Sequence, residues 1–284
     1  MGNVLAWLCC MVLLTAAGES APVSLTAGEH SWGRFLPNTW CIVQTVTVSN
    51  RDGRAVQSTQ TVKTTLQSVD EGGVTLQEAE RLELAGKVVE KEPQTVKYDF
   101  FNEPVQENVQ VRLGAHGLPT RLMVDRKVVP CAVRIYEQQT SGGQLTTTLW
   151  YTPQVYPYVL RVEKILQSVP EGESAGGQII RQSVMLVQET AALKALRGNR
   201  RNRTYTVRTE EKAGNITRIT DARCSWDYPG GLLESTTQEL DAQGREIRRS
   251  VSRMTNYFFH ESFPIQQPLQ PAWVVPLVPA ETAQ

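Results

Sequence analysis

The chain has 284 residues, of which 40% are hydrophobic and 20% are charged. This balance is typical of a folded domain and excludes an intrinsically disordered chain. Basic and acidic residues both number 29, so no net charge attracts the protein to nucleic acid or to anionic lipid, and we expect no nucleic-acid partner.

An unbroken run of apolar or small residues extends from Val4 to Ala17. It is too short for a membrane-spanning helix, which needs about 20 apolar residues. It fits the apolar core of a secretory signal with small residues at Ala16 and Ala17 for cleavage, although no lysine or arginine precedes it. We therefore predict a signal peptide over residues 1–21 and export to the periplasm, the cell envelope or the extracellular space. A retained N-terminal anchor is the alternative; after cleavage we expect no integral membrane span.

The next segment, Pro22–Asn38, is mixed in composition, with Trp32 and Phe35 as predicted anchors. From Trp40 onward, apolar and polar residues alternate with a period of two, and the turn Arg51–Arg54 separates two alternating stretches, which is a strong hairpin signal. Further turns are predicted at Glu71–Gly73, Gly86–Lys87, Gly114–Pro119, Asp125–Arg126 and Ser141–Gly143. Strands at this spacing predict a mainly β protein, an antiparallel meander that forms a curved sheet or incomplete barrel.

Two stretches have some helical character. Residues 74–85 also fit one face of a helix, but we favour a strand because a Gly-Gly pair precedes them. Residues 190–197 predict one short helix.

Two internal similarities indicate that the chain contains two related units. A tryptophan, a Tyr-Pro pair, an apolar couple and a glutamate follow one another in residues 150–163 and again in residues 226–234. Residues 66–72 also resemble residues 166–172.

The repeat, the signal peptide and the C-terminal segment together divide the chain into four parts. We predict a first β unit over residues 22–163 and a second, shorter β unit over residues 164–262, after the signal peptide. Five prolines follow, and they predict an extended or polyproline-like tail over residues 263–284.

The stretch Tyr151–Tyr158 contains three tyrosines and two prolines. We favour a structural interpretation, in which the prolines stiffen a strand exit and the aromatic rings cap the core. The functional hypothesis is an aromatic-lined binding corner for a peptide, a glycan or an apolar ligand. Its candidate residues in the two similar segments are Trp150, Tyr151, Tyr156, Pro157, Tyr158, Trp226 and Tyr228.

Three cysteines would remain after signal cleavage: Cys41, Cys131 and Cys224. We favour burial of all three as small apolar residues. One structural disulfide is the alternative, since an odd number in an oxidising compartment leaves at least one thiol over. The chain has no CxxC pair, and its three histidines lie far apart in sequence, so we expect no metal site.

Catalysis would need a nucleophile beside a base. Cys131 and His116 form the least unfavourable pair, but Cys131 follows Val129-Pro130 in a predicted strand interior, where a thiol is usually inert. No serine elbow, zinc-protease helix or phosphate-binding glycine loop is present. The carboxylate pair Glu210-Glu211 is predicted to lie on a polar face. We therefore predict no catalytic residues, no cofactor and no enzymatic activity.

The sequence resembles uncharacterised exported β-repeat proteins that are typical of planctomycete bacteria. The residues that carry the resemblance are Gly117–Pro119, Val129–Cys131 and the pattern Trp150–Arg161, and it covers about residues 32–260. It implies export and a β-rich fold, but no activity. In architecture alone, the predicted sheet is similar to the curved half-barrels of periplasmic lipoprotein carriers, from which no ligand-binding residue can be transferred.

These observations leave three functional hypotheses. The first is an exported, non-enzymatic binding or structural protein that meets a protein, glycan or lipid of the cell envelope through the concave sheet face or the binding corner. The second is a carrier of lipid or another apolar ligand, which predicts a cavity lined by apolar side chains. The third, which we consider weakest, is a thiol- or His-dependent hydrolase.

Overall fold

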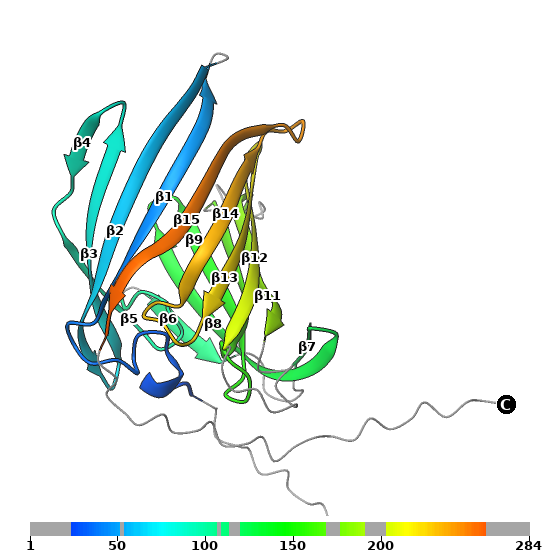
Figure 1. The fold of residues 1–284 in the computed structure, drawn as a ribbon. Coiled ribbons are helices and arrows are strands. Elements are labelled where there is room, and N and C mark those ends of the chain that lie inside the picture. Colours follow the sequence, from blue (N-terminus) through cyan, green and yellow to red (C-terminus); the bar gives the residue numbers. More distant parts are fainter. Residues whose placement is uncertain are drawn as a thin grey trace, which may run out of the picture.

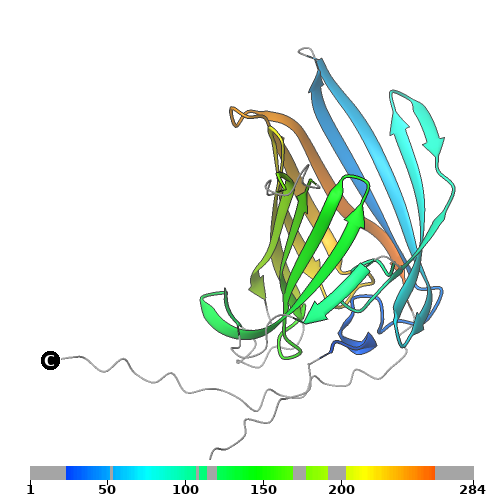
Figure 2. The same cartoon turned by 180° about the vertical axis from the view of Figure 1, so that it is seen from behind.

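The computed structural model describes residues 24–51, 54–106, 109–113, 120–168, 177–190 and 203–259. Their strands form one antiparallel sheet of fifteen strands in the order β4-β3-β2-β1-β15-β14-β13-β12-β11-β10-β9-β8-β6, with β5 beside β3 and β7 beside β8. The sheet curves strongly and does not close on itself (Figure 1, Figure 2). The predicted mainly β fold with an incomplete barrel is confirmed.

The strands of the first half of the chain are β1 (Trp40–Arg51), β2 (Arg54–Asp70), β3 (Gly73–Leu84), β4 (Lys87–Glu90), β5 (Gln94–Tyr98), β6 (Val109–Leu113), β7 (Thr120–Val124) and β8 (Lys127–Thr140). Those of the second half are β9 (Gly143–Tyr151), β10 (Val159–Gln167), β11 (Ile179–Thr190), β12 (Thr204–Ala213), β13 (Ile216–Ser225), β14 (Leu232–Leu240) and β15 (Glu246–Phe258). The described helix is a single 3₁₀ turn, η1 (Ala27–Glu29).

Most of the hairpins lie where the turn residues predict them. Arg51 pairs with Arg54 across the β1–β2 turn, and Asp70 pairs with Gly73 across the β2–β3 turn. Residues 73–84 form a strand, as we favoured, because they pair with β2 along their whole length. The Gly-Gly pair before this stretch therefore indicated correctly a strand and not a helix, which its periodicity also allowed.

The last strand returns to the first. β15 pairs with β1 from Trp40↔Phe258 to Ser49↔Arg248, which joins the two ends of the described chain in the middle of the sheet. The predicted boundary between residues 163 and 164 falls inside β10. The common origin of the two predicted units stays a prediction.

A segment before β1 packs against one end of the curved sheet, at the bottom of Figure 1. Its predicted anchors Trp32 and Phe35 are buried with Cys41, Leu66 and Val74 in one core cluster. A neighbouring cluster is built from Leu25, Phe101, Tyr136, Leu149 and Tyr151. Segments 24–39 and 99–104 thus lie across this end of the sheet, and we call these two segments the floor.

Several predicted segments lie outside the described residues: the signal peptide (1–21), most of the predicted helix (191–197), residues 114–119 with His116, and the Pro-rich tail (263–284). Thr190, the first residue of the predicted helix, is instead the last residue of β11. In the part of the chain that the structure describes, no helix is long and apolar enough to cross a membrane.

Candidate ligand-binding cavity

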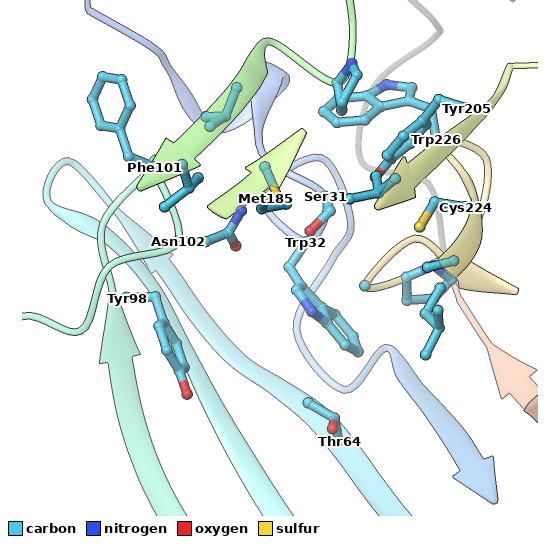
Figure 3. A pocket seen from close by; sticks show the side chains of 18 of the residues that line it. Ser31, Trp32, Thr64, Tyr98, Phe101, Asn102, Met185, Tyr205, Cys224 and Trp226 are labelled. Carbon is cyan, nitrogen blue, oxygen red and sulfur yellow. The ribbon is translucent and has the colours of Figure 1, made fainter. Parts of the chain in front are cut away.

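The concave side of the sheet forms a partly open cavity of about 610 Å³ next to the floor. Figure 3 shows the side chains of Trp32, Tyr98, Met185 and Cys224 directed toward this space from four different elements. The apolar lining comes from Trp32, Val43, Leu76, Phe100, Phe101, Val159, Val162, Met185, Val187, Val207, Ala222, Trp226, Leu232 and Met254. Strand alternation explains this lining, because every second residue of a strand faces the same side of the sheet.

Two aromatic residues of the floor close the deep end of the cavity. The indole of Trp32 is only 5% exposed and packs so closely against Gly230 that a Cβ there would lie 3.0 Å from the ring. Phe101 packs edge-on against Tyr151 at 4.8 Å between ring centroids. Asp99 fixes this loop, because its Oδ1 accepts hydrogen bonds from the backbone N–H groups of Phe101 (2.9 Å) and Glu103 (3.0 Å).

Above the apolar residues, the concave face carries a row of hydroxyl groups. Strand register aligns Thr47, Ser250, Thr237, Thr220 and Thr209 across five neighbouring strands. Thr47 and Ser250 share a hydrogen bond of 2.9 Å, and Thr220 and Thr237 share another of 2.9 Å. These pairs satisfy the hydrogen bonding of their hydroxyl groups within the sheet. Since hydroxyl groups are uncharged, this band is polar but carries no charge.

Beyond the hydroxyl groups lies a row of charged side chains. Register aligns Lys164, Ser183, Glu211, Arg218, Glu239 and Arg248 across strands β10 to β15. Thr209 lines the cavity two residues before Glu211, which places this row on the same concave face. We call these residues, together with Arg181, the charged row.

Ion pairs connect the charged row. Arg218 lies between two carboxylates, with Nη2 at 2.7 Å from Glu239 and Nη1 at 3.3 Å from Glu211. Arg181 reaches Glu211 at 2.8 Å, and Arg248 reaches Glu239 at 3.8 Å. The hydrogen bond with Glu239 is the main reason why the pKa of Arg218 is raised, so this guanidinium is permanently charged.

One further charge pair lies in the cavity wall. Lys164 contacts Glu103 of the floor loop at 2.9 Å, and both residues line the cavity. Burial raises the pKa of Glu103, and the neighbouring ammonium of Lys164 opposes this rise. The pair ties β10 to the floor.

The structure distributes the seven residues of the predicted corner over several environments. Pro157 and Trp226 line the cavity, and Tyr158 meets Trp226 edge-on at 5.1 Å, so the two similar segments do come together at the floor end. The other members face elsewhere. Tyr151 is 1% exposed in a core cluster, Tyr156 packs near Tyr205, Trp150 lies under the guanidinium of Arg161, and Tyr228 packs against Tyr257.

The three cysteines are buried as free thiols at separate places. Cys41 and Cys224 line the cavity, whereas Cys131 packs with Val124, Val129 and Leu160 in a cluster that includes β7 and β8. Burial raises the pKa of Cys41 to about 12 and that of Cys131 and Cys224 to about 11. Thiols with such values are almost fully protonated at neutral pH and react slowly.

A buried histidine supports the floor. His30 is 1% exposed, and its Nδ1 accepts a hydrogen bond of 3.1 Å from the backbone N–H of Trp32. Burial lowers the pKa of His30 to about 4, while Asn102 and Asp99 act weakly in the opposite direction. Among the described residues, no group of three or more His, Cys, Asp or Glu side chains could hold a metal ion.

The charged row was not predicted from the sequence. Glu211 belongs to a carboxylate pair that we placed on a polar face, yet its side chain is only 17% exposed and bonded to two arginines. Its partners come from strands that are adjacent only in the folded sheet. A sequence signal exists only in retrospect, as the alternation of charged and hydroxyl residues in β12 to β15.

Comparison with known proteins gives no family assignment. No protein-family model matches the chain, and no curated protein matches it. Similar solved structures include an exported protein with a YmcC-like fold from Bacteroides fragilis, with 9% identity and a TM-score of 0.27, which covers 79% of this chain and 98% of that chain. A domain of an outer membrane lipoprotein-sorting protein from Vibrio parahaemolyticus has 10% identity and a TM-score of 0.26, and covers 81% of this chain and 88% of that chain.

The domain from Vibrio parahaemolyticus comes from a lipoprotein-sorting protein, and the predicted sheet was compared with lipoprotein carriers. Likeness at such TM-scores carries no argument about function. No finding supports the resemblance to planctomycete proteins, which stays a prediction.

Proposed function

We propose that this protein is an exported, non-enzymatic binding protein that holds an apolar ligand in the concave cavity. The observation that carries the proposal is the cavity of about 610 Å³ with its predominantly apolar lining. Sites for small molecules in proteins typically measure about 300–1,000 Å³ and are mostly apolar with a few polar groups. The volume and the lining both fit a ligand of this kind.

A purely structural role accounts less well for this interior. Protein cores are packed as densely as organic crystals and contain few voids larger than a water molecule. A scaffold would gain stability by filling this space with a larger side chain at a position such as Ala222, which instead lines the cavity. The small residue at this position favours a space kept for a ligand.

The export part of the proposal rests on the sequence of residues 1–21. A signal peptide there would deliver the mature protein to the periplasm or cell envelope. In that compartment an apolar molecule needs shielding from water during transfer, and a carrier of lipid or a similar molecule is the role that the cavity suits best.

The test is a titration of the mature protein with N-phenyl-1-naphthylamine, a neutral apolar dye whose fluorescence rises in apolar surroundings. We expect saturable binding with one dye per chain. Ala222→Phe should weaken binding at least about tenfold, because the added ring occupies the cavity next to Val207. Thr236→Phe is the matched control: its neighbour Ser235 pairs with Ala222, so Thr236 faces the opposite side of the sheet.

Dye binding that is absent, or that Ala222→Phe and Thr236→Phe weaken equally although both variants keep the wild-type circular dichroism, would overturn the proposal. A filled interior would then leave the structural role as the better account.

A further inference from the structure

We propose that the charged row binds the anionic head group of an amphiphilic ligand whose single aliphatic chain occupies the cavity. This inference rests on the proposed function and adds the chemical class of the ligand. It is carried by the position of the row, by the unequal burial of its two signs of charge, and by the polarity gradient along the concave face.

The charged row is continuous with the cavity wall. Lys164 and Ser183 line the cavity and pair with each other in register, and Ser183 pairs with Glu211. From there, the row continues across β13, β14 and β15 without a break. A ligand that fills the cavity therefore meets the charged row where it leaves the apolar residues.

In the charged row, the positive side chains are more exposed to solvent than the negative ones. The side chains of Arg181, Arg218 and Arg248 are 57%, 43% and 47% exposed, whereas those of Glu211 and Glu239 are 17% and 12% exposed. The carboxylates hold the guanidinium groups in place from below. With Lys164 and its partner Glu103 included, these ion pairs contain four positive and three negative side chains.

The guanidinium groups of Arg181 and Arg248 retain donors for a ligand, whereas Arg218 already donates from Nε and Nη2 to Glu239 and from Nη1 to Glu211. The ion pairs of the described residues involve Nε of Arg181 and Nη1 of Arg248, and each guanidinium carries five N–H donors in a planar fork. A carboxylate or phosphate accepts two parallel hydrogen bonds from such a fork, which is stronger than a neutral contact. An anion is therefore the group that fits the exposed side of the row.

The distance along the strands suits a chain-like molecule. Arg218 lies six residues before Cys224 on β13, which corresponds to about 20 Å of strand, and both side chains face the concave side. Ala222 and Thr220 lie between them on the same face, so polarity rises along β13 from Cys224 toward Arg218. An extended amphiphile has the same gradient from its tail to its head.

The experiment compares dodecanoate with 1-dodecanol at pH 8, each displacing N-phenyl-1-naphthylamine from the mature protein. The two share a twelve-carbon chain, and only dodecanoate carries a charge at this pH. We expect dodecanoate to bind about tenfold more tightly, which corresponds to about one charge-assisted hydrogen bond. Sodium acetate, which offers the same head group without the chain, should not displace the dye at the same concentrations.

Variants of the row separate binding from a structural role. Arg248→Gln should weaken dodecanoate about tenfold and leave dodecanol within about twofold, whereas Glu239→Gln should tighten dodecanoate because it releases Arg218 and Arg248. Arg208→Gln is the matched control, since it removes an arginine on the opposite face of β12, where Arg208 pairs with Asp221. It should change neither affinity.

Each remaining outcome counts against the inference. Equal affinities for dodecanoate and dodecanol, or an Arg248→Gln variant that weakens both equally, would overturn it while the apolar cavity stands. Displacement by acetate would show that the row binds free anions and not the head of an amphiphile. If the dye itself does not bind, the proposed function fails and this inference fails with it.

Discussion

The buried His30 of the floor contributes to the response of the protein to acid. His30 is neutral in the folded state, because burial lowers its pKa to about 4, whereas an unfolded chain has the ordinary value near 6.5. As the pH falls below 6.5, the unfolded state takes up a proton that the folded state does not bind. The contribution of this histidine to stability is therefore present above pH 6.5 and is lost progressively down to about pH 4.

We predict that the free energy of unfolding of the wild type falls between pH 7 and pH 4.5 by about 2 kcal/mol more than that of His30→Gln. Glutamine offers an acceptor for the N–H of Trp32 but does not titrate. Urea unfolding of both proteins at the two pH values measures the difference, and the shared carboxylates cancel. Equal losses in the two proteins would show that His30 is protonated in the folded state at pH 4.5.

For the three cysteines, the sequence predicted burial but not the surroundings of each thiol. Two of the three cysteines lie beside a tryptophan in the sequence, and all three are buried in the structure. The sequence could not reveal that Cys41 and Cys224 line the cavity while Cys131 does not, because that depends on which face of each strand turns inward. The hydrolase hypothesis stays untested, since His116 lies outside the described residues.

Among the elements, the hairpins depend on glycines at particular turns. Gly143 begins β9 with φ +136°, and a Cβ there would lie 1.9 Å from the carbonyl oxygen of Gln167. We predict that Gly143→Ala destabilises the protein by about 3 kcal/mol or more, through backbone strain and the clash with β10. Gly214→Ala is the control, because Gly214 has φ +55° with nothing within 4 Å of a Cβ, and it should cost about 1 kcal/mol.

Thermal or urea unfolding of the two variants measures these costs. A loss as small for Gly143→Ala as for Gly214→Ala would mean that β10 moves aside easily. The comparison therefore also reports how rigidly β9 and β10 are held together beside the cavity wall.

Local signals predicted the elements better than their partners. A turn such as Arg51–Arg54 lies within a few residues of the strands that it joins, so its glycine and aspartate predict the hairpin directly. The pairing of β1 with β15 joins residues about 200 positions apart, and no local pattern specifies it. The charged row depends on such register over six strands, which explains why alternation predicted the curved sheet but not the site on its concave face.

At the scale of the whole molecule, the sheet has no internal border. β15 continues the sheet from β14 to β1, and β10 continues it from β9 to β11, so strands of the two predicted units lie side by side. The core clusters at the floor combine residues before β1 with residues from β2, β3, β8 and β9. The cavity wall likewise draws on both units, from Val43 to Met254.

This continuity predicts that the described body unfolds as one unit. A fragment of residues 22–163 would lose β15 from the edge of β1, and it would lose the second half of β10 together with β11, which leaves unpaired strand edges at both places. We expect the mature chain to show a single urea transition that coincides by circular dichroism and by tryptophan fluorescence. The fragment should show no cooperative transition. Two separate transitions in the mature chain, or a fragment that unfolds cooperatively, would instead indicate independent units, and the cavity would then have to form between domains that fold alone.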